Sequence, residues 1–198
     1  MPSFAQSGTS SSRHSKTVTH ATPAPDVGVL ADNLYRNRFF AFSYKVPFGW
    51  VDRTSSMRQE STGGDARKSE ESPLLLVSVF ERPPEATGDT VNSSVLTAAE
   101  RVSTYPGLKD ASQYFGPVTE LTTSKGFKVV NGPHDVEVGG RQLVEADYSK
   151  ELGKNAMRQS TLAMIDKGYI VSFTFIGGSE DEVEELIGNL GFLAPARH

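Results

Sequence analysis

The chain contains no cysteine, which excludes a disulfide scaffold, a thiolate metal site and a cysteine nucleophile. Uninterrupted apolar runs are only a few residues long, as in "LLLV" at 74–77, so we expect no transmembrane helix. Basic residues are not in excess, because 20 lysines and arginines stand against 24 aspartates and glutamates and give a net charge of −4. Surfaces that bind duplexes are usually basic, so nucleic acid is disfavoured as a partner.

Histidine is also scarce: there are four, and only His134 lies in the part of the chain that is patterned to fold. The sequence has no G-x-S-x-G nucleophile elbow and neither of the two common glycine-rich phosphate loops. Asp135 follows His134, but two adjacent residues do not make a metal site. The sequence therefore predicts no catalytic residue, no metal site and no cofactor, and we expect a protein that is not an enzyme.

Residues 1–29 are rich in Ser, Thr, Ala and Pro and have no apolar period. This composition predicts a disordered leader whose removal costs little stability. Within it, Ser3-Phe4-Ala5 before Gln6 is similar to the end of a secretory signal, where small residues flank the cleavage point. We therefore expect export to the periplasm or the outside of a bacterium, with a flexible cytoplasmic tail as the alternative. Residues 30–198 are long enough to form one domain.

The stretch "RFFAFSYKVP" at 38–47 alternates apolar and smaller or polar residues with a period of two, which predicts a half-buried strand. The apolar positions are Phe40, Phe42, Tyr44 and Val46. A Pro-Phe-Gly turn follows and leads to Trp50, the only tryptophan. We expect these aromatic residues to form part of the core and Trp50 to be largely buried; a ligand platform is the alternative.

In the middle of the chain, residues that interrupt helices and strands alternate with short apolar runs. A capped turn is expected at 34–37, a long exposed loop at 54–72 and a well-covered strand at 73–81. Apolar residues at helical spacing predict a helix over 93–105, and a second short helix is expected over 108–115.

The C-terminal half is dominated by strand-like runs at 126–130, 134–138, 141–151, 155–165 and 169–176. Gly139-Gly140 and the sequence Asp-Lys-Gly at 166–168 lie between such runs and predict hairpins, because their residues accept a positive φ.

A helix is expected to begin at Ser179, because Glu182 three residues later completes a capping box. Its apolar stripe consists of Val183, Leu186, Ile187 and Leu190. Gly191 stands where a C-terminal cap would lie. Together these elements predict an α+β fold: an antiparallel sheet of about six strands with helices packed on it, as an α/β/α sandwich.

Three segments resemble the PsbP-like α/β/α proteins: "NRFFAFSYKVPFGW" at 37–50, "VGGRQLVEADY" at 138–148 and "GYIVSFTFIGGSEDEVEELIGNLGF" at 168–192. The resemblance spans roughly residues 33–193 and rests on pattern and order. It implies a non-enzymatic binding or assembly role, and no functional residue of that group can be matched here. The polar stretch 54–72 departs from the family pattern and is a candidate for this protein's own function.

The sequence thus favours an exported binding or assembly module that contacts a protein or envelope component, as a monomer. The alternative is a small-ligand or metal-binding carrier with a pocket between sheet and helices. Trp50, Arg141 and Tyr148 are the residues expected to contact the partner or ligand.

Overall fold

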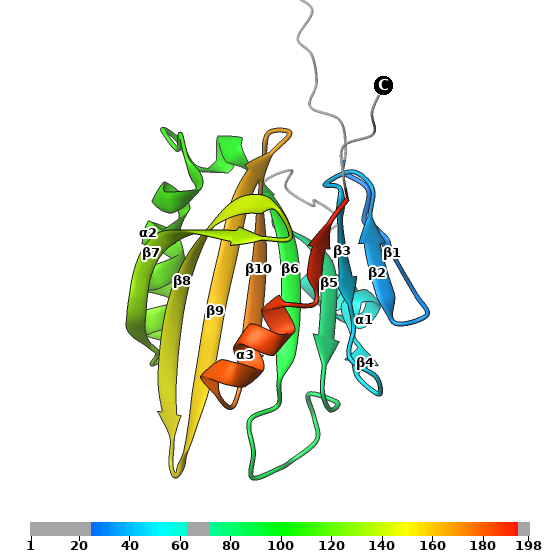
Figure 1. Ribbon diagram of the computed structural model, residues 1–198, viewed down its shortest axis with the longest axis vertical. Helices are drawn as coiled ribbons and strands as arrows, with labels where there is room; N and C mark the ends of the chain where they lie inside the picture. The colour runs from blue at the N-terminus through cyan, green and yellow to red at the C-terminus, as the bar shows by residue number, and fades with distance from the viewer. Residues whose placement is uncertain (1–24, 63–71, 194–198) are drawn as a thin grey trace, which may run out of the picture.

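The computed structural model describes residues 25–62 and 72–193 (Figure 1). Within them, eleven strands form two antiparallel sheets. The smaller sheet has the order β1 (Val29–Ala31), β2 (Leu34–Asn37), β3 (Phe42–Lys45) and β11 (Leu190–Phe192). The larger sheet has the order β4 (Val51–Asp52), β5 (Leu74–Phe80), β6 (Ser94–Arg101), β10 (Tyr169–Gly177), β9 (Asn155–Asp166), β8 (Arg141–Leu152) and β7 (Lys128–Val138).

Three α-helices lie in the described ranges: α1 (Thr54–Thr62), α2 (Phe115–Ser124) and α3 (Glu180–Ile187). Two 3-10 turns, Val102–Thr104 and Ala111–Tyr114, precede α2. The expected α+β class, with helices packed on an antiparallel sheet, is confirmed, and the main sheet has seven strands.

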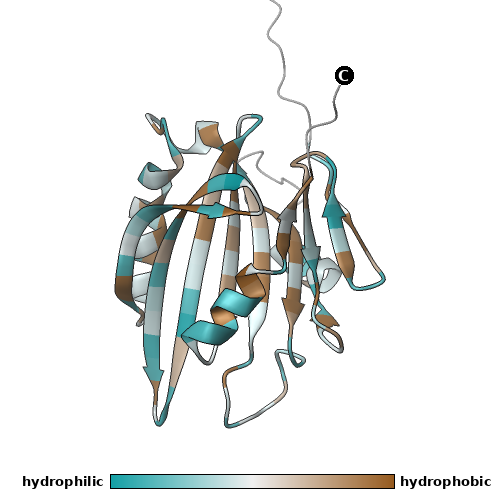
Figure 2. Ribbon diagram, viewed as in Figure 1, coloured by the Kyte–Doolittle hydropathy of each residue, from teal (hydrophilic) through white to brown (hydrophobic). Residues whose placement is uncertain are grey.

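The main core lies between the two sheets. Aromatic residues of β3 meet those of β10, with the Phe42 and Phe173 rings edge to face and their centroids 5.0 Å apart. Val183 and Leu186 of α3 extend the same cluster. Figure 2 shows hydrophobic and hydrophilic residues alternating around α3, as expected for a helix with one buried face.

The opposite face of the seven-stranded sheet carries a second cluster. Phe115 at the start of α2 and Tyr114 before it pack with Ala146, Tyr148 and Ile170 of the sheet. The central strands are therefore covered on both faces, which explains their nearly continuous apolar runs.

The alternation predicted for the aromatic strand is confirmed, because Phe40, Phe42, Tyr44 and Val46 are all buried. Trp50 is less buried than expected: it is only half-buried and packs at the border of the main cluster. The capped turn expected at 34–37 is wrong. Those residues form β2, and the turn lies at Asp32 and Asn33, which both have a positive φ.

The helix predicted over 93–105 is also wrong, because residues 94–101 form β6. Val95, Thr97 and Ala99 are buried on one face of the strand. β6 pairs with β5 on one side and β10 on the other, so both of its backbone edges are hydrogen-bonded within the sheet. Tertiary pairing therefore overrides the helical spacing of its apolar residues.

The short helix expected to end at Gly116 is wrong in its position. Asp110 caps the 3-10 turn by accepting hydrogen bonds from the Ser112 and Gln113 amides, and α2 begins only at Phe115. Pro117 lies in the first turn of α2, where its missing N–H costs nothing.

The stretch expected to be an exposed loop at 54–72 begins with α1, and residues 63–71 lie outside the described residues. β4 pairs with only two residues of β5, which leaves the edge of β5 open near its start. Arg58 of α1 fills this edge by donating hydrogen bonds of 2.6 Å to the carbonyl oxygens of Leu75 and Leu76.

The leader boundary expected at residue 29 is too late, although residues 1–24 lie outside the described residues. The Asp26 carbonyl accepts a hydrogen bond from the Asn37 side-chain amide at 2.8 Å, and the Val27 carbonyl accepts one from the Tyr35 hydroxyl at 2.9 Å. Residues 26–29 therefore belong to the folded unit.

Both predicted hairpins are confirmed, with positive φ angles at Gly139 and Gly140 and at Lys167 and Gly168. The runs expected at 126–130 and 134–138 join into the single strand β7, which absorbs Gly132-Pro133 through shifts of register.

The start of α3 is confirmed, because Ser179 Oγ accepts a hydrogen bond from the Glu182 amide at 3.2 Å. The Glu182 carboxylate accepts from the Gly178 amide instead of the Ser179 amide. The expected C-terminal cap at Gly191 is wrong: α3 ends at Ile187, and Leu190 and Gly191 belong to β11.

Candidate binding groove

A cavity of about 390 Å³ lies between β7 and α3, and we call it the β7–α3 groove. Its lining residues come from β8 and β9, which form its floor, and from β7 and α3, which form its two walls. Figure 1 shows α3 and the end of β7 on the same side of the large sheet. Its lining includes carboxylates, apolar side chains, one histidine and one arginine. The residues are Val130, Asn131, His134, Val136, Glu137, Val138, Glu145, Asp147, Tyr148, Arg158, Gln159, Ser160, Glu180, Val183, Glu184 and Ile187.

Strand alternation places Glu145 and Asp147 of β8 on the same face as the buried Leu143, which belongs to the main core. Ala146 and Tyr148 point to the opposite face and join the second cluster. The carboxylates thus occupy core-facing positions at the end of the main core, where α3 and β7 leave a cavity.

Asp147 is held by two neighbouring strands. Its Oδ1 atom accepts a hydrogen bond from the Ser160 hydroxyl of β9 at 2.5 Å, and its Oδ2 atom accepts one from the Asn131 side-chain Nδ2 of β7 at 2.9 Å. Both residues are also the cross-strand partners of Asp147 in the sheet. Asp147 is therefore a structural member of the groove floor.

Glu145 is in a different situation. Its side chain is only 15% exposed, and the nearest cationic partner is His134, whose Nε2 atom lies 3.8 Å from Oε2. No described residue donates a hydrogen bond to this carboxylate. Burial, reinforced by the negative charges of Asp147 and Glu184, raises the pKa of Glu145 to about 7, while His134 opposes the shift.

The walls combine apolar surface with negative charge. Val136 and Val138 of β7 and Ile187 of α3 pack against the main core beside the groove. Glu180 and Glu184 line it from α3, and Arg158 lines it from β9. Carboxylates therefore outnumber the cationic groups, and the arrangement suits a ligand with an apolar body and a positive charge.

The tip of the β7–β8 hairpin reaches toward the smaller sheet (Figure 1). Val138, the last residue of β7, lines the groove. Gly139 has a φ of +58°, which glycine adopts readily, and a Cβ atom added there would lie 3.4 Å from the Phe192 amide nitrogen, so the hairpin tip packs against β11. Arg141 lies over the Phe192 ring at 5.8 Å and pairs with Asp166 at 3.5 Å. These contacts fix the hairpin that carries the β7 wall.

The three residues expected to contact a ligand are not brought together. β4 and β8 are separated by four strands, so Trp50 lies far across the sheet from the other two. Arg141 and Tyr148 point to opposite faces of β8. Arg141 anchors the hairpin, and Tyr148 is buried with its hydroxyl 2.9 Å from Thr119 Oγ1, although it also borders the groove.

Sequence reasoning missed Glu145 and Asp147, although a signal was present. In Leu143-x-Glu145-x-Asp147, two carboxylates continue the period of a core-facing leucine. Acidic residues at core-facing strand positions are unusual unless they are paired or functional.

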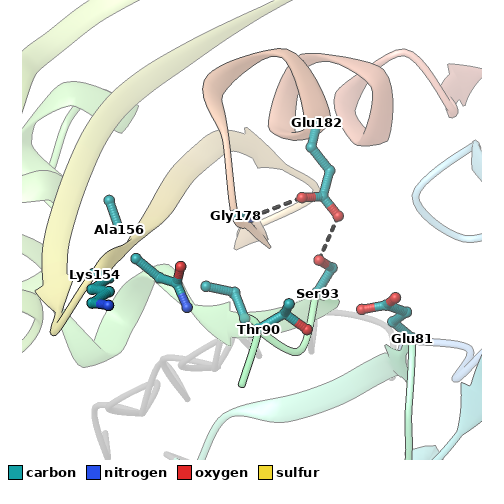
Figure 3. A pocket seen from close by; sticks show the side chains of 9 residues that line it. Glu81, Thr90, Ser93, Lys154, Ala156, Gly178 and Glu182 are labelled. Carbon is teal, nitrogen blue, oxygen red and sulfur yellow. Dashed lines mark hydrogen bonds between the residues drawn. The ribbon is translucent and has the colours of Figure 1, made fainter. Parts of the chain in front are cut away.

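A second cavity of about 480 Å³ lies on the other side of α3 (Figure 3). Glu182 points into it, and its carboxylate accepts hydrogen bonds from the Gly178 amide at 2.8 Å and from the Ser93 hydroxyl at 2.5 Å. These contacts connect the start of α3 to the residue before β6, so Glu182 has a structural role.

No three His, Asp or Glu side chains in residues 25–62 and 72–193 are grouped so that they could hold a metal ion. Among the helices of the same ranges, none has the length and apolar character needed to cross a membrane.

No protein-family model matches the chain, and no curated protein matches it. Among solved structures, it is similar to PsbP (CyanoP) of Synechocystis sp. PCC 6803, with 18% identity over 83% of this chain and 95% of that one and a TM-score of 0.48. A Pseudomonas aeruginosa protein of unknown function shares 14% identity over 83% of this chain and 97% of that one, with a TM-score of 0.39.

LpqN, a protein involved in cell envelope biogenesis of Mycobacterium tuberculosis, shares 10% identity over 77% of this chain and 83% of that one, with a TM-score of 0.39. These similarities are consistent with the PsbP-like fold group that the sequence resembles. At such identities and TM-scores they carry no argument about function.

Proposed function

We propose that the protein is a non-enzymatic binding module of the bacterial envelope or periplasm, and that the β7–α3 groove binds an extended segment of a protein partner. The observation that carries this proposal is Glu145, a largely buried carboxylate on the floor of an apolar-walled groove, to which none of the residues that the structure describes donates a hydrogen bond. Such a group has binding capacity that the fold itself does not use. The assignment to the envelope is supported by the small residues before Gln6.

A hydrolytic role is less well supported by the same residues. Paired-carboxylate hydrolysis needs two carboxyl groups that are free to act on the substrate. Both oxygens of Asp147 instead accept hydrogen bonds from neighbouring strands. Ser160 donates its hydroxyl proton to Asp147 across the strands, and this hydrogen bond holds both side chains in the sheet.

The size of the groove fits a short extended segment. Its volume of about 390 Å³ lies in the range of small-ligand pockets and accommodates a few side chains. An exposed edge strand forms one wall, because β7 has β8 as its only partner in the sheet. Two adjacent valines of this wall, Val129 and Val130, are exposed by 46% and 52%, and only Val130 lines the groove.

These two valines supply a matched test. The full chain is used to select linear peptides from a displayed heptapeptide library, and their affinities are then measured for Val130→Arg and Val129→Arg. We expect Val130→Arg to weaken binding at least about tenfold, which corresponds to about 1.4 kcal/mol, whereas Val129→Arg retains it. Peptides that bind both variants equally would overturn the groove as the binding surface. Binding of spermidine without any selected peptide would favour the small-ligand carrier.

A further inference from the structure

Resting on the proposed role of the groove, we propose that it recognises a basic side chain of the partner, a lysine or an arginine, by seating the positive charge on Glu145. The partner is then defined by a positive charge, and Glu145 is the residue that recognises it. It also couples binding to the release of a proton.

The charged groups that face Glu145 come from every surrounding element. β7 contributes His134 directly opposite, and β8 contributes Asp147. Glu137 also borders the cavity, but its carboxylate accepts a hydrogen bond from Gln142 on the opposite face of the hairpin. Arg158 lines the groove from β9, while Glu180 and Glu184 line it from α3. Three further carboxylates therefore line the groove with Glu145, against one arginine and one histidine, and the groove favours a cation.

Within this group, Glu145 is the carboxylate best placed to accept new hydrogen bonds. Asp147 already accepts one at each oxygen, and the two glutamates of α3 are exposed. A lysine ammonium offers three donors and an arginine guanidinium five, so either supplies what Glu145 lacks. Partial burial makes such a charge-assisted hydrogen bond stronger than one on the surface.

The apolar walls match the rest of such a side chain. Val130, Val136 and Val138 of β7 face Val183 and Ile187 of α3 across the groove. The methylene stems of lysine and arginine pack on apolar surface while the charged head reaches a polar group. The stem contributes contact area, and Glu145 contributes the selection for charge.

Proton release follows from the environment of Glu145. With a pKa of about 7 in the free protein, this carboxyl group is partly protonated at neutral pH. A cation within about 4 Å favours the ionised form and lowers its pKa. Binding therefore displaces the proton to solvent, and it strengthens as the pH rises and more Glu145 is already ionised.

Three short peptides test the inference: acetyl-Val-Lys-Val-amide, its norleucine analogue without the charge, and its glutamate analogue. Binding to the full chain is followed at pH 8 by the NMR signal of the Glu145 carboxyl carbon. The lysine peptide is expected to bind at least about tenfold more tightly than the norleucine peptide. Between pH 8 and pH 6 its affinity should fall about tenfold, because the ionised fraction of a group with a pKa near 7 falls from about nine-tenths to about one-tenth.

Two variants distinguish charge recognition by Glu145 from peptide binding in the groove as such. Glu145→Gln should bind the lysine and norleucine peptides equally, whereas Glu120→Gln, an exposed carboxylate on α2, should keep the preference. If the unmodified chain bound the lysine and norleucine peptides equally, or bound the glutamate peptide more tightly, charge recognition by Glu145 would be overturned. The groove would still stand as the binding surface. If selected heptapeptides also ignore Val130→Arg, the groove itself is not the binding surface.

Discussion

His134 of β7 lies directly opposite Glu145 of β8, with 3.8 Å between its Nε2 atom and the carboxylate. The pair is asymmetric, because the histidine side chain is 44% exposed and the glutamate side chain only 15%. The exposed partner offsets little of the cost of burying the other charge. The protein therefore holds a carboxylate whose ionisation opposes folding.

The first prediction follows from that cost. The pKa of Glu145 is raised from 4.5 to about 7 in the folded protein, so the folded state holds the proton more tightly than the unfolded state does. The stabilising contribution of the protonated form is complete below about pH 4.5 and is lost as the pH rises to about 7. Glu145→Gln should therefore be more stable than the unmodified chain at pH 8, by on the order of 2 kcal/mol.

Urea unfolding between pH 4 and pH 8 measures this difference. The gap between Glu145→Gln and the unmodified chain should shrink toward pH 4, because Glu145 is then protonated in both states. Glu120→Gln serves as the control on the exposed face of α2 and should show no such pH-dependent gap. A gap for Glu145→Gln that is constant with pH would contradict the assigned titration.

The second prediction concerns the packing of α3. Leu186 is 4% exposed and belongs to the main cluster, so Leu186→Ala should lower the free energy of unfolding by about 2–5 kcal/mol. Ser179→Ala removes the N-terminal cap and should cost about 1 kcal/mol. Glu185→Ala, at an exposed position, should change stability by less than about 0.5 kcal/mol. Denaturant unfolding compares the three; near-normal stability of Leu186→Ala would show that α3 is not part of the core.

The third prediction concerns the edge of β5. Arg58→Met keeps most of the side-chain stem but removes the donors to the Leu75 and Leu76 carbonyls. We expect a loss of roughly 1.5–3 kcal/mol, typical of hydrogen bonds from a charged donor. The uncovered edge should also promote association at high protein concentration. Urea unfolding and light scattering measure the two effects, and Arg38→Met on the exposed surface is the control. If Arg58→Met were monomeric and fully stable, Arg58 would not be needed to satisfy the open edge of β5.

The fourth prediction tests the start of the folded unit. A chain that begins at Leu30 should melt at a lower temperature than one that begins at Pro25, because it lacks the Asp26 and Val27 carbonyls that accept hydrogen bonds from Asn37 and Tyr35. At about 1 kcal/mol for each bond, the melting temperature should fall by roughly 5 °C. Equal melting temperatures would restore residue 29 as the boundary.

Gly28→Ala probes the same segment without truncation. Gly28 has a φ of +72°, and an added Cβ atom would overlap the Tyr35 hydroxyl and lie 2.8 Å from the Arg36 carbonyl oxygen. This variant should destabilise the protein in the same direction as the truncation, as measured by thermal unfolding.

The sequence predicts best those elements whose local pattern and tertiary environment agree. Phe42 and Tyr44 alternate in sequence and are buried in the structure, and Gly139-Gly140 makes the hairpin that its φ preferences predict. β6 shows the opposite case. Val95 and Ala99 stand four residues apart, which fits one face of a helix and equally one face of a strand. Pairing with β5 and β10 decides between them, and neither partner is visible from the local sequence.

The groove illustrates a second limit. Glu145 is partnered by His134 only through the register of β7 on β8, and that register shifts twice before it reaches this pair. The other wall of the groove comes from α3, which begins more than thirty residues after Glu145 in the sequence. Local patterns therefore predict the strands and the helix that form the groove, whereas their assembly depends on the bulges of one edge strand.

β11 joins the beginning of the folded chain to its end. Its residues Leu190–Phe192 pair with Phe42–Tyr44 of β3 and complete the smaller sheet over the main core. Contacts between such distant segments form late, because a long loop must close first. During synthesis, the smaller sheet remains without its fourth strand until residue 192 has left the ribosome. Until then the β3 edge that β11 will occupy stays unpaired, so β3 cannot complete its hydrogen bonding before the segment that contains β11 has been made.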